Sequence, residues 1–379
     1  MTMPSPGLLR AAAAAGAHMA DRNTPLIRNE WYVAAFSSEL GRTLTRRKLL
    51  GRNVVMYRTR DGRPVALDDR CAHRSFPLSA GRLEEDTIVC GYHGFRYDPA
   101  GDCIEVPSQA KCPKGIGVRA YPVIEQDSLV WIWMGDPLRV DQARVPSLPW
   151  LSSADWAVSQ GYFALPASYV SLHENLMDLT HLSYLHAKSF GTADYALAPY
   201  ETRLEDGHYV LLRRVVPTRL PPVWAQPTGI LGDTAARIAQ SEFVSPGLHV
   251  VTVDFYDSAL APAARRTFQI RTAHIPTPES QTSTHYFIVH GRNFALDQPP
   301  VTQFMHEQLF KAFQEDVSGL CAIERTLIEA DDEVYEISVA SDAAGVAMRK
   351  YLKRRADEER GPCHRRADRR VTPGTRGTV

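Results

Sequence analysis

The sequence predicts an α+β protein with two domains: an all-β domain over residues 25–145 and a domain of mixed helices and strands over residues 146–355. Three observations predict this fold class. Residues 25–145 hold short apolar runs bounded by turn-forming residues, as paired β-strands do. Residues 146–355 contain strand-like runs between two stretches with the apolar spacing of a helix. The chain has 379 residues, which is long enough for two domains with a sizeable core.

The first domain is expected to consist of β-hairpins. The short apolar runs Val54–Tyr57 and Val65–Leu67 flank the pair Asp61-Gly62, which is typical of a hairpin turn. Two further turns are expected, at Asp98–Asp102 and at Gln126-Asp127. Strands joined by such short turns are neighbours in an antiparallel sheet.

Two short segments of this domain pair cysteine with histidine: Cys71-Ala72-His73 and Cys90-Gly91-Tyr92-His93. Each segment supplies one thiolate and one imidazole, so the two cysteines can bind one iron of a [2Fe–2S] cluster while the two histidines bind the other. This is the ligand pattern of a Rieske centre, in which the neutral imidazoles raise the reduction potential. The predicted cluster ligands are therefore Cys71, His73, Cys90 and His93.

A structural zinc site is the alternative interpretation of these four residues, because zinc also binds two cysteines together with two histidines. Zinc fingers usually group like ligands, however, as C-x-x-C followed by H-x₃₋₅-H, whereas each segment here is mixed. The residues around the second segment, including Gly94 and Phe95, favour a tight aromatic turn whose packing tunes potential and solvent access. We therefore prefer the iron–sulfur cluster.

The stretch 164–187 is expected to be helical and carries the pattern N-x-x-D-x-x-H-x₄-H, formed by Asn175, Asp178, His181 and His186. A non-haem Fe(II) that activates O₂ needs two histidines and one carboxylate on one side of the metal, and the two histidines here are candidates. Their spacing of five residues does not place both on one face of a regular helix. We therefore expect the helix to end, or to widen by a π-bulge, between them. The alternative is a pair of half-buried histidines in a leucine-rich helix.

Four strand-like runs follow, and we expect them to form the sheet of the second domain: Tyr209–Val216, Leu248–Phe255, Thr267–His274 and Thr284–His290. The stretch Pro217–Gly232 is rich in proline and glycine. We expect it to be a loop near the entrance of a pocket.

The second helix is expected over residues 302–330, where apolar residues recur with helical spacing: Phe310, Phe313, Val317, Leu320, Ile323 and Leu327. Asp316 lies beside this apolar stripe and is the candidate carboxylate ligand of the iron. Its rivals are Glu315, which should face solvent more, and Asp331 and Asp332, which follow the end of the stripe.

These motifs resemble those of the Rieske non-haem iron oxygenases. A third, looser segment, His285–Arg325, is similar to the C-terminal part of the oxygenases of the vanillate O-demethylase and dicamba monooxygenase group; it contains Gly291-Arg292-Asn293-Phe294 and Glu315-Asp316. The resemblance covers roughly residues 25–345. It implies a Rieske [2Fe–2S] domain followed by a helix-grip catalytic domain, in which an antiparallel sheet wraps a long helix.

The resemblance implies that Asp316 is the third ligand of a mononuclear Fe(II), beside His181 and His186. It gives Asp178 a different role, as a carboxylate that links His181 by hydrogen bonds to His93 of the next subunit; the alternative is an ordinary capping or surface carboxylate. Such a link fixes ring orientation and raises the basicity of the imidazoles. It also requires an oligomer, which the resemblance implies to be a cyclic trimer.

Two further residues receive expected roles from the resemblance. Asn175 is expected to be a polar group near the iron. The segment around His274 aligns with the pocket wall of the resembling enzymes, so His274 is a candidate contact for the substrate. The alternative is an ordinary sheet histidine without a ligand.

The implied function is that of the oxygenase component of a multicomponent monooxygenase, which uses O₂ and supplied electrons to hydroxylate an aromatic substrate with O- or N-demethylation. An aromatic carboxylate is the leading substrate class. Ring hydroxylation is the alternative reaction, and a Rieske electron carrier without oxygenase activity is the alternative of another class. The iron motif argues against the carrier, which needs no such ligands. Because the chain has no G-x-G-x-x-G fingerprint for a nucleotide, a separate NAD(P)H-dependent reductase, with or without a ferredoxin, is the expected partner.

The composition fits a cytoplasmic enzyme that binds neither nucleic acid nor membranes. Basic and acidic residues number 43 each, so net charge creates no attracting field. No apolar run approaches the ~20 residues that a membrane span needs. Cysteines outside the cluster motif are expected to be free thiols, which suits a reducing compartment: Cys103, Cys112, Cys321 and Cys363. Residues 1–24 and 356–379 are expected to be disordered.

Overall fold

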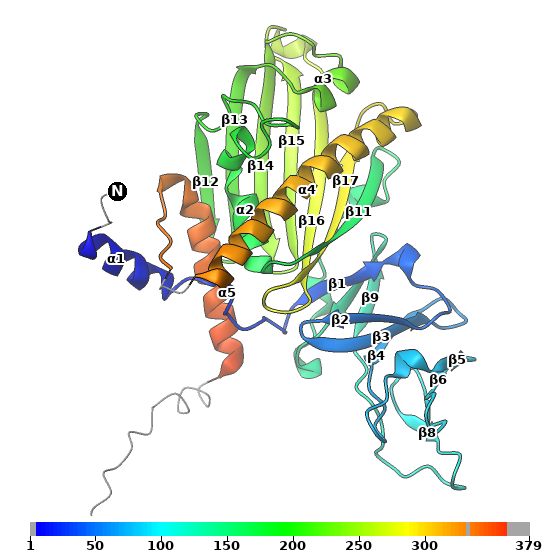
Figure 1. Ribbon diagram of the computed structural model, residues 1–379. Helices are drawn as coiled ribbons and strands as arrows, with labels where there is room; N and C mark the ends of the chain where they lie inside the picture. Colours follow the sequence, from blue (N-terminus) through cyan, green and yellow to red (C-terminus); the bar gives the residue numbers. More distant parts are fainter. Residues whose placement is uncertain (1–4, 331–333, 362–379) are drawn as a thin grey trace, which may run out of the picture.

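The computed structural model describes residues 5–330 and 334–361. Small antiparallel sheets form the N-terminal part of the chain, and one seven-stranded sheet crossed by a long helix forms the C-terminal part (Figure 1). The predicted α+β class is therefore confirmed.

The N-terminal part contains ten short strands: β1 (Trp31–Phe36), β2 (Thr45–Leu49), β3 (Arg52–Arg58), β4 (Pro64–Asp68), β5 (Arg82–Glu84), β6 (Thr87–Val89), β7 (Arg96–Tyr97), β8 (Cys103–Glu105), β9 (Val123–Gln126) and β10 (Leu129–Trp133). They form three sheets with the orders β1-β10-β9, β2-β3-β4 and β5-β6-β7-β8. The three predicted turns join β3 to β4, β7 to β8 and β9 to β10. In the last of them Asp127 and Ser128 both have positive φ, as a two-residue type I′ turn requires.

The C-terminal sheet is antiparallel throughout, with the order β11-β17-β16-β15-β14-β13-β12. Its strands are β11 (Ala157–Leu165), β12 (Tyr200–Glu205), β13 (His208–Thr218), β14 (Ala235–Ser245), β15 (Leu248–Asp257), β16 (Phe268–Pro278) and β17 (Thr284–Arg292). The four predicted strand runs lie in β13, β15, β16 and β17. The other three strands were not predicted, because their polar residues and glycine interrupt the apolar pattern.

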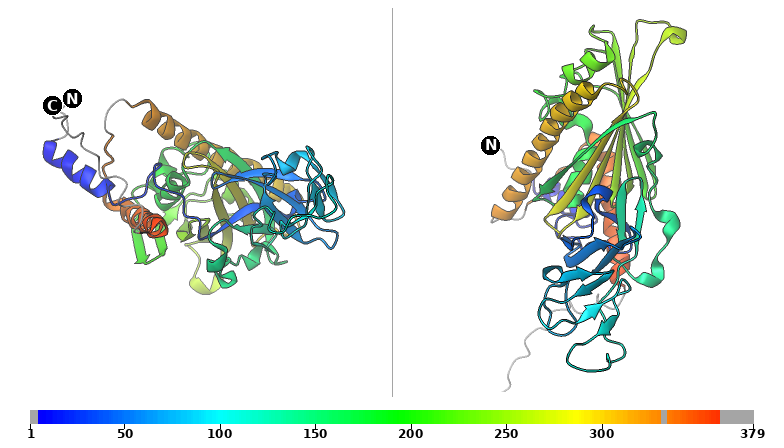
Figure 2. Two further views of the ribbon diagram at one scale, coloured as in Figure 1. Left: turned by 90° about the horizontal axis from the view of Figure 1, so that it is seen from below. Right: turned by 90° about the vertical axis from the view of Figure 1, so that its right-hand side faces the viewer.

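Five helices accompany the sheets within the described residues: α1 (Pro6–Gly16), α2 (Tyr169–Met177), α3 (Pro222–Thr228), α4 (Pro299–Glu329) and α5 (Ala343–Arg360). The side view in Figure 2 shows α4 lying along one face of the seven-stranded sheet. Gly161 of β11 allows this close packing, because a Cβ there would lie 2.0 Å from a ring carbon of Phe310 on α4. The long helix and the sheet that wraps it have the predicted helix-grip arrangement. Short 3₁₀ turns lie at Ser37–Glu39, Leu78–Ala80, Pro137–Arg139, Gln142–Arg144, Pro149–Leu151, Pro262–Ala264 and Ala340–Asp342.

The apolar stripe of α4 is shorter than predicted. Phe313, Val317 and Leu320 are buried, but Ile323 is 54% exposed. The side of α4 that is buried in this turn carries Glu324, which is 3% exposed, so Ile323 faces outward.

Three segments expected to be irregular or disordered are partly helical. The expected loop Pro217–Gly232 contains α3, which starts at a proline in its first turn and ends at Gly229 with φ 74°, a left-handed cap. Within the expected disordered extension 1–24, α1 is capped by Ser5, whose Oγ accepts a hydrogen bond from Leu8 N at 3.3 Å. Its alanine run favours helix, and residues 1–4 lie outside the described part. Within the expected tail 356–379, α5 continues to Arg360, and residues 362–379 lie outside the described part.

Buried aromatic residues join the two parts of the chain. Trp31 and Trp133 of the N-terminal sheet share a core with Ile275 and Phe287 of β16 and β17. The strands β5–β8 lie at the end of the N-terminal part that points away from the seven-stranded sheet (Figure 1). The loops between these strands are therefore remote from the shared core.

Candidate active site

The end of helix α2 positions the two candidate histidines, because the backbone leaves the helical conformation there. α2 ends at Met177, where the next residue, Asp178, has an extended backbone (φ −115°, ψ 100°). The Asp178 carboxylate accepts a hydrogen bond from Thr180 N at 2.8 Å and so caps the short 3₁₀ helix η6 (Leu179–Ser183). His181 lies in η6 and His186 follows it. The helix of residues 164–187 is thus shorter than predicted, and a helical segment does end between the two histidines.

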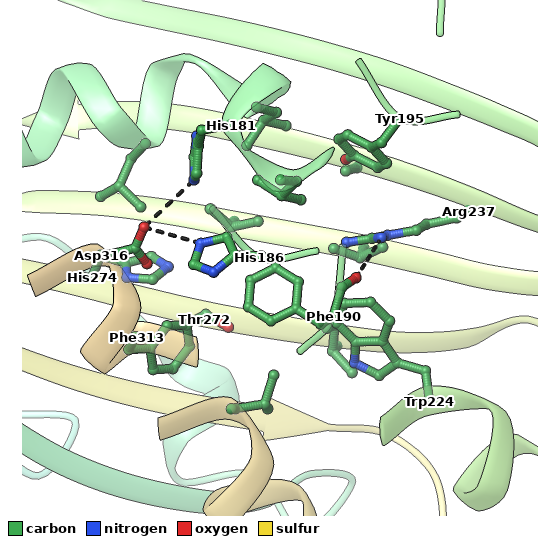
Figure 3. Close-up of a pocket in the computed structure, with 18 residues that line it drawn as sticks. His181, His186, Phe190, Tyr195, Trp224, Arg237, Thr272, His274, Phe313 and Asp316 are labelled. Carbon is green, nitrogen blue, oxygen red and sulfur yellow. Dashed lines mark hydrogen bonds and ion pairs between the residues drawn. The ribbon is translucent and has the colours of Figure 1, made fainter. Parts of the chain in front are cut away.

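His181, His186 and Asp316 converge on one point between η6 and α4 (Figure 3). One ligand atom from each lies within 4.8 Å of the others. The Asp316 carboxylate oxygen Oδ1 is 3.0 Å from His186 Nε2 and 3.5 Å from His181 Nε2. The rival Asp331 and Asp332 lie outside the described residues. Among the candidate acids that the structure describes, Asp316 is the one that meets both histidines.

The electrostatics of this group suit a cation. Burial acts to raise the pKa of Asp316, which is 4% exposed, but hydrogen bonds and charge from His181 and His186 outweigh it and hold that pKa well below its ordinary value. Burial acts to lower the pKa of His186, but the carboxylates of Asp316 and Glu315 outweigh it and raise that pKa. Asp316 is therefore anionic near neutral pH, as a metal ligand must be.

Glu315 has a place that the sequence did not predict. It was expected to face solvent, yet its Oε2 accepts hydrogen bonds from His186 Nδ1 at 2.8 Å and from Ser189 Oγ at 2.7 Å. A carboxylate on the remote nitrogen of a metal-binding histidine fixes the ring and its tautomer. An acid next to a ligand in sequence was the available signal, but the turn that brings Ser189 over α4 cannot be inferred from helical periodicity.

Two polar residues of the iron motif complete the surroundings. Asn175 Nδ2 donates to Asp316 Oδ1 at 3.2 Å, while its buried Oδ1 has no hydrogen-bond partner among the described residues. The backbone carbonyl of Asp178 accepts a hydrogen bond from His181 Nδ1. The Asp178 carboxylate was expected in that position, and in the described chain this carboxylate caps η6 instead.

The donor set fits a mononuclear iron. The Nδ1 atoms of both histidines are hydrogen-bonded to oxygen, on Glu315 and on the Asp178 carbonyl. With protons on Nδ1, a bound metal would take the Nε2 lone pairs in place of the contacts that both Nε2 atoms make with Asp316 here. Two imidazole nitrogens and a carboxylate are the facial set of non-haem Fe(II) sites that leave coordination positions open for O₂.

A pocket begins at this donor set and extends between α4 and the sheet (Figure 3). It encloses about 560 Å³ of empty space, its open mouth included. Its walls are mostly apolar, with side chains of Leu176, Val251, Ile270 and Leu309. A mostly apolar wall with a few polar groups is typical of a small-molecule site.

His274 lies in this pocket, near Asp316, as Figure 3 shows. Its Nδ1 is hydrogen-bonded to the hydroxyl of Tyr286, and its ring packs edge-on against Phe313 at 5.4 Å. Burial lowers the pKa of His274 to about 4, so the ring is neutral near pH 7. Several pocket residues were not predicted from the sequence, among them Phe190, Tyr195, Trp224 and Arg237.

The four candidate cluster ligands lie in the loops before β5 and between β6 and β7. Cys71 and Cys90 are buried, whereas His73 and His93 are exposed, with their ring centroids 4.6 Å apart. Each cysteine loop is closed by backbone hydrogen bonds, such as Cys71 N to Phe76 O at 2.8 Å and Cys90 N to Phe95 O at 2.8 Å. The residues thus form two matching turns with buried thiols and exposed imidazoles.

The surroundings of the thiols fit a [2Fe–2S] cluster. The Tyr97 hydroxyl lies 3.1 Å from Cys71 Sγ, and hydrogen bonds to cluster sulfur tune the reduction potential. Burial raises the pKa of the Cys90 thiol in the metal-free chain. The other described cysteines, Cys103, Cys112 and Cys321, are free thiols as predicted, and Cys363 lies outside the described residues.

Comparison with known proteins decides the family. Residues 30–122 match the Rieske [2Fe–2S] domain, and residues 165–358 match the vanillate O-demethylase oxygenase C-terminal domain. The chain belongs to the Rieske non-haem iron oxygenases. This Rieske oxygenase is 35% identical over 343 residues to the iron–sulfur subunit of the toluene-4-sulfonate monooxygenase system of Comamonas testosteroni, with 88% of the chain and 98% of that relative covered.

Two further relatives show the same family. A vanillate O-demethylase oxygenase subunit of Pseudomonas sp. strain HR199 is 31% identical over 339 residues, covering 86% of this chain and 94% of the relative. The crystal structure of dicamba monooxygenase bound to 3,6-dichlorosalicylic acid matches with a TM-score of 0.84 and 28% identity, covering 89% of this chain and 99% of that one. The cofactors of this Rieske oxygenase are accordingly a [2Fe–2S] cluster and a mononuclear iron, and zinc is not needed to explain the cysteines.

Within the described residues, no helix is long and apolar enough to cross a membrane.

Proposed function

We propose that this chain is the oxygenase component of a multicomponent monooxygenase that hydroxylates the methyl group of a small aromatic acid. The observation that carries the proposal is the buried set of two histidines and one carboxylate in the wall of an enclosed apolar pocket, on a chain that also carries a Rieske domain. The names of two relatives also support an aromatic acid as substrate, because one contains vanillate and the other toluene-4-sulfonate. Hydroxylation of an O- or N-methyl group gives a hemiacetal or hemiaminal, which collapses with release of formaldehyde.

In this proposal His181, His186 and Asp316 bind Fe(II), and Asn175 lies beside them as a polar group. The iron, when bound, supplies O₂ activation with electrons that pass through the cluster. Cys71, His73, Cys90 and His93 hold that cluster in a domain of residues 25–145, and residues 146–355 form the iron-binding domain.

The other side chains position and shield the substrate. Glu315 and the Asp178 carbonyl hold the imidazole rings so that both Nε2 atoms face Asp316. The apolar wall excludes water from the reacting carbon. His274 is neutral and lies at the same end of the pocket, so it is suited to a hydrogen bond with the substrate near the reacting group.

Electron transfer is proposed to occur between subunits of a cyclic trimer. The exposed histidines His73 and His93 lie on loops remote from the core that joins the two parts of one chain. The Asp178 carboxylate is only partly buried, so it can accept a hydrogen bond from His93 of the partner subunit while its own carbonyl holds His181. A separate NAD(P)H-dependent reductase, with or without a ferredoxin, supplies the electrons, and the free thiols support a reducing, cytoplasmic location.

Two other functions are tested by the same experiment. Ring hydroxylation of an aromatic acid would use the same iron and pocket. A Rieske electron carrier would need neither, and the buried donor set disfavours it.

The test begins with iron, acid-labile sulfide and an electron paramagnetic resonance spectrum of the reduced, full-length protein. About three irons and two sulfides per chain, with a Rieske signal, are expected for one cluster and one mononuclear site. With a reductase, methoxy- and methylamino-benzoates should then release formaldehyde. Ring-hydroxylated product without formaldehyde would favour the second reaction, and about two irons per chain that Fe(II) addition does not increase would favour the carrier.

A further inference from the structure

The pocket contains a buried positive charge that lacks a countercharge. Arg237 of β14 is 2% exposed, and within the described residues it makes one hydrogen bond, from Nη1 to Phe190 O at 3.1 Å. Its Nε has no hydrogen-bond partner, and no carboxylate of the described residues forms a salt bridge with it. The field of Asp194 reaches it, but the Asp194 carboxylate accepts a hydrogen bond from Thr218 Oγ1 at 2.7 Å.

Two aromatic rings flank this guanidinium. The Arg237 guanidinium carbon lies 4.3 Å from the ring centroid of Trp224 and 4.5 Å from that of Tyr195. A guanidinium that stacks on rings keeps its N–H edge available for the bidentate recognition of an oxyanion. Buried charges in proteins are paired or bind a counterion, because an unpaired buried charge is unfavourable. A ligand of opposite charge would supply the missing partner.

Two neutral donors at the same end of the pocket are also unpaired. The hydroxyl of Tyr195 and the indole Nε1 of Trp224 are buried, and neither has a hydrogen-bond partner in the described structure. Both residues line the pocket together with Arg237, as Figure 3 shows. Buried polar groups are nearly always hydrogen-bonded. Three unpaired donors on residues that line one pocket therefore favour an acceptor with several oxygens as the missing partner.

We propose that Arg237, Tyr195 and Trp224 form the receptor for the acid group of the substrate, a carboxylate or a sulfonate. This inference rests on the proposed function and adds the substrate's orientation to it. The receptor residues are specificity-determining, since they hold the part of the substrate that does not react.

The geometry also limits the distance between the two ends of the substrate. The Phe190 ring stacks on the His186 ring with centroids 4.5 Å apart, and the Arg237 guanidinium carbon lies 6.0 Å from the Phe190 ring. These two distances place the guanidinium within 10.5 Å of the His186 ring. In Figure 3 Arg237 lies on the side of Phe190 away from Asp316. An upper limit of this size allows one aromatic ring to lie between an acid group bound at Arg237 and a methyl group near the iron ligands.

The test compares anionic and neutral ligands of the same shape. Dissociation constants are measured by calorimetry on the iron-loaded full-length protein with toluene-4-sulfonate, 4-methoxybenzoate and the neutral 4-methoxybenzamide. In Arg237→Gln we expect binding of the acids to weaken about 100-fold, the loss typical of a charged hydrogen-bond pair, with the amide changed less than about threefold. Arg237→Lys should recover part of the acid affinity, because it keeps the charge without the planar edge.

The matched control is Arg271→Gln. Arg271 lies on β16 between Ile270 and Thr272, which both line the pocket, so its side chain is on the opposite face of the sheet, over Trp156. The Arg271→Gln substitution removes the same charge from the same sheet, so all three dissociation constants should stay unchanged. If Arg237→Gln does not fold, Tyr195→Phe is the second variant, with an expected loss of about tenfold for the acids only.

An unchanged ratio of acid to amide affinity in these variants would overturn the receptor, and so would an equal loss for acid and amide, which indicates a structural role. If the wild-type protein binds either acid more tightly than the amide, this supports the proposed acid-binding site and shows whether it prefers a sulfonate or a carboxylate. If acid binding depends on Arg237 but no oxidised product forms, the proposed function would be contradicted while the acid-binding site would still be supported. Product formation with an unchanged ratio would contradict the receptor alone.

Discussion

Replacing Glu315 with glutamine tests whether this carboxylate prepares His186 for metal binding. Glu315 Oε2 accepts the hydrogen bonds from His186 Nδ1 at 2.8 Å and Ser189 Oγ at 2.7 Å, and glutamine keeps the shape without the charge. Loss of such a partner of a metal-binding histidine typically lowers metal affinity 10- to 100-fold, or about 1.4 to 2.7 kcal/mol. We expect Glu315→Gln to weaken mononuclear iron binding by this amount.

The assay is competition for Fe(II) with a chromophoric chelator under anaerobic conditions. The visible spectrum and the sulfide content of the cluster should not change, because Glu315 lies in the other part of the chain. Glu307→Gln is the matched control: Glu307 is an exposed acid of the same helix that accepts a hydrogen bond from Gln303 at 3.0 Å. Iron affinity that is unchanged in Glu315→Gln, or that falls equally in Glu307→Gln, would refute the reasoning.

Three other predictions concern an iron ligand, the carboxylate of Asp178 and a buried histidine of β17. Asp316→Ala should remove the mononuclear iron while the Rieske spectrum stays; iron analysis that finds the cluster lost and the mononuclear iron retained would contradict the ligand assignment. Asp178→Asn should keep both metals but slow single-turnover reoxidation of the reduced cluster at least about tenfold, and unchanged turnover would exclude its bridging role. Burial lowers the pKa of His290 to about 3 from its ordinary 6.5, so the unfolded chain takes up a proton that the folded chain does not, and stability falls as pH decreases below 6.5. At pH 5.5 the free energy of unfolding is lower by about 1.4 kcal/mol for this reason. His290→Gln should therefore reduce the difference between the thermal midpoints at pH 7.5 and pH 5.5. An unchanged difference would show that the imidazole is not buried in its neutral form.

The iron motif could be predicted from the sequence because its chemistry is local. His181 and His186 lie five residues apart, and Asp316 is next to an apolar stripe on a long helix. Ligand types and spacing therefore gave the candidates, and the resemblance to the Rieske oxygenases favoured Asp316 over the rival acids. The supporting residues could not be predicted in this way. Glu315 would face solvent on an isolated helix, and only the turn that carries Ser189 makes it a partner of His186.

The fold was predictable where apolar runs are continuous and obscure where polar residues interrupt them. β13, β15, β16 and β17 were visible in the sequence, whereas β14 was not, because arginine, glutamine, serine and glutamate alternate with its apolar residues. Arg237 was therefore missed along with its strand. The helix α1 was missed for another reason: a short alanine-rich stretch with no apolar stripe resembles an unstructured extension.

The residues that line the pocket come from two layers, the helical segments and the sheet. All three proposed metal ligands come from η6, the turn after it and α4, whereas Arg237, Thr272 and His274 come from strands of the sheet below. A substitution on a strand can therefore alter which molecule is accepted without disturbing the atoms that perform the oxidation. Such a separation allows substrate preference to diverge during evolution by single steps, each of which leaves a working catalyst.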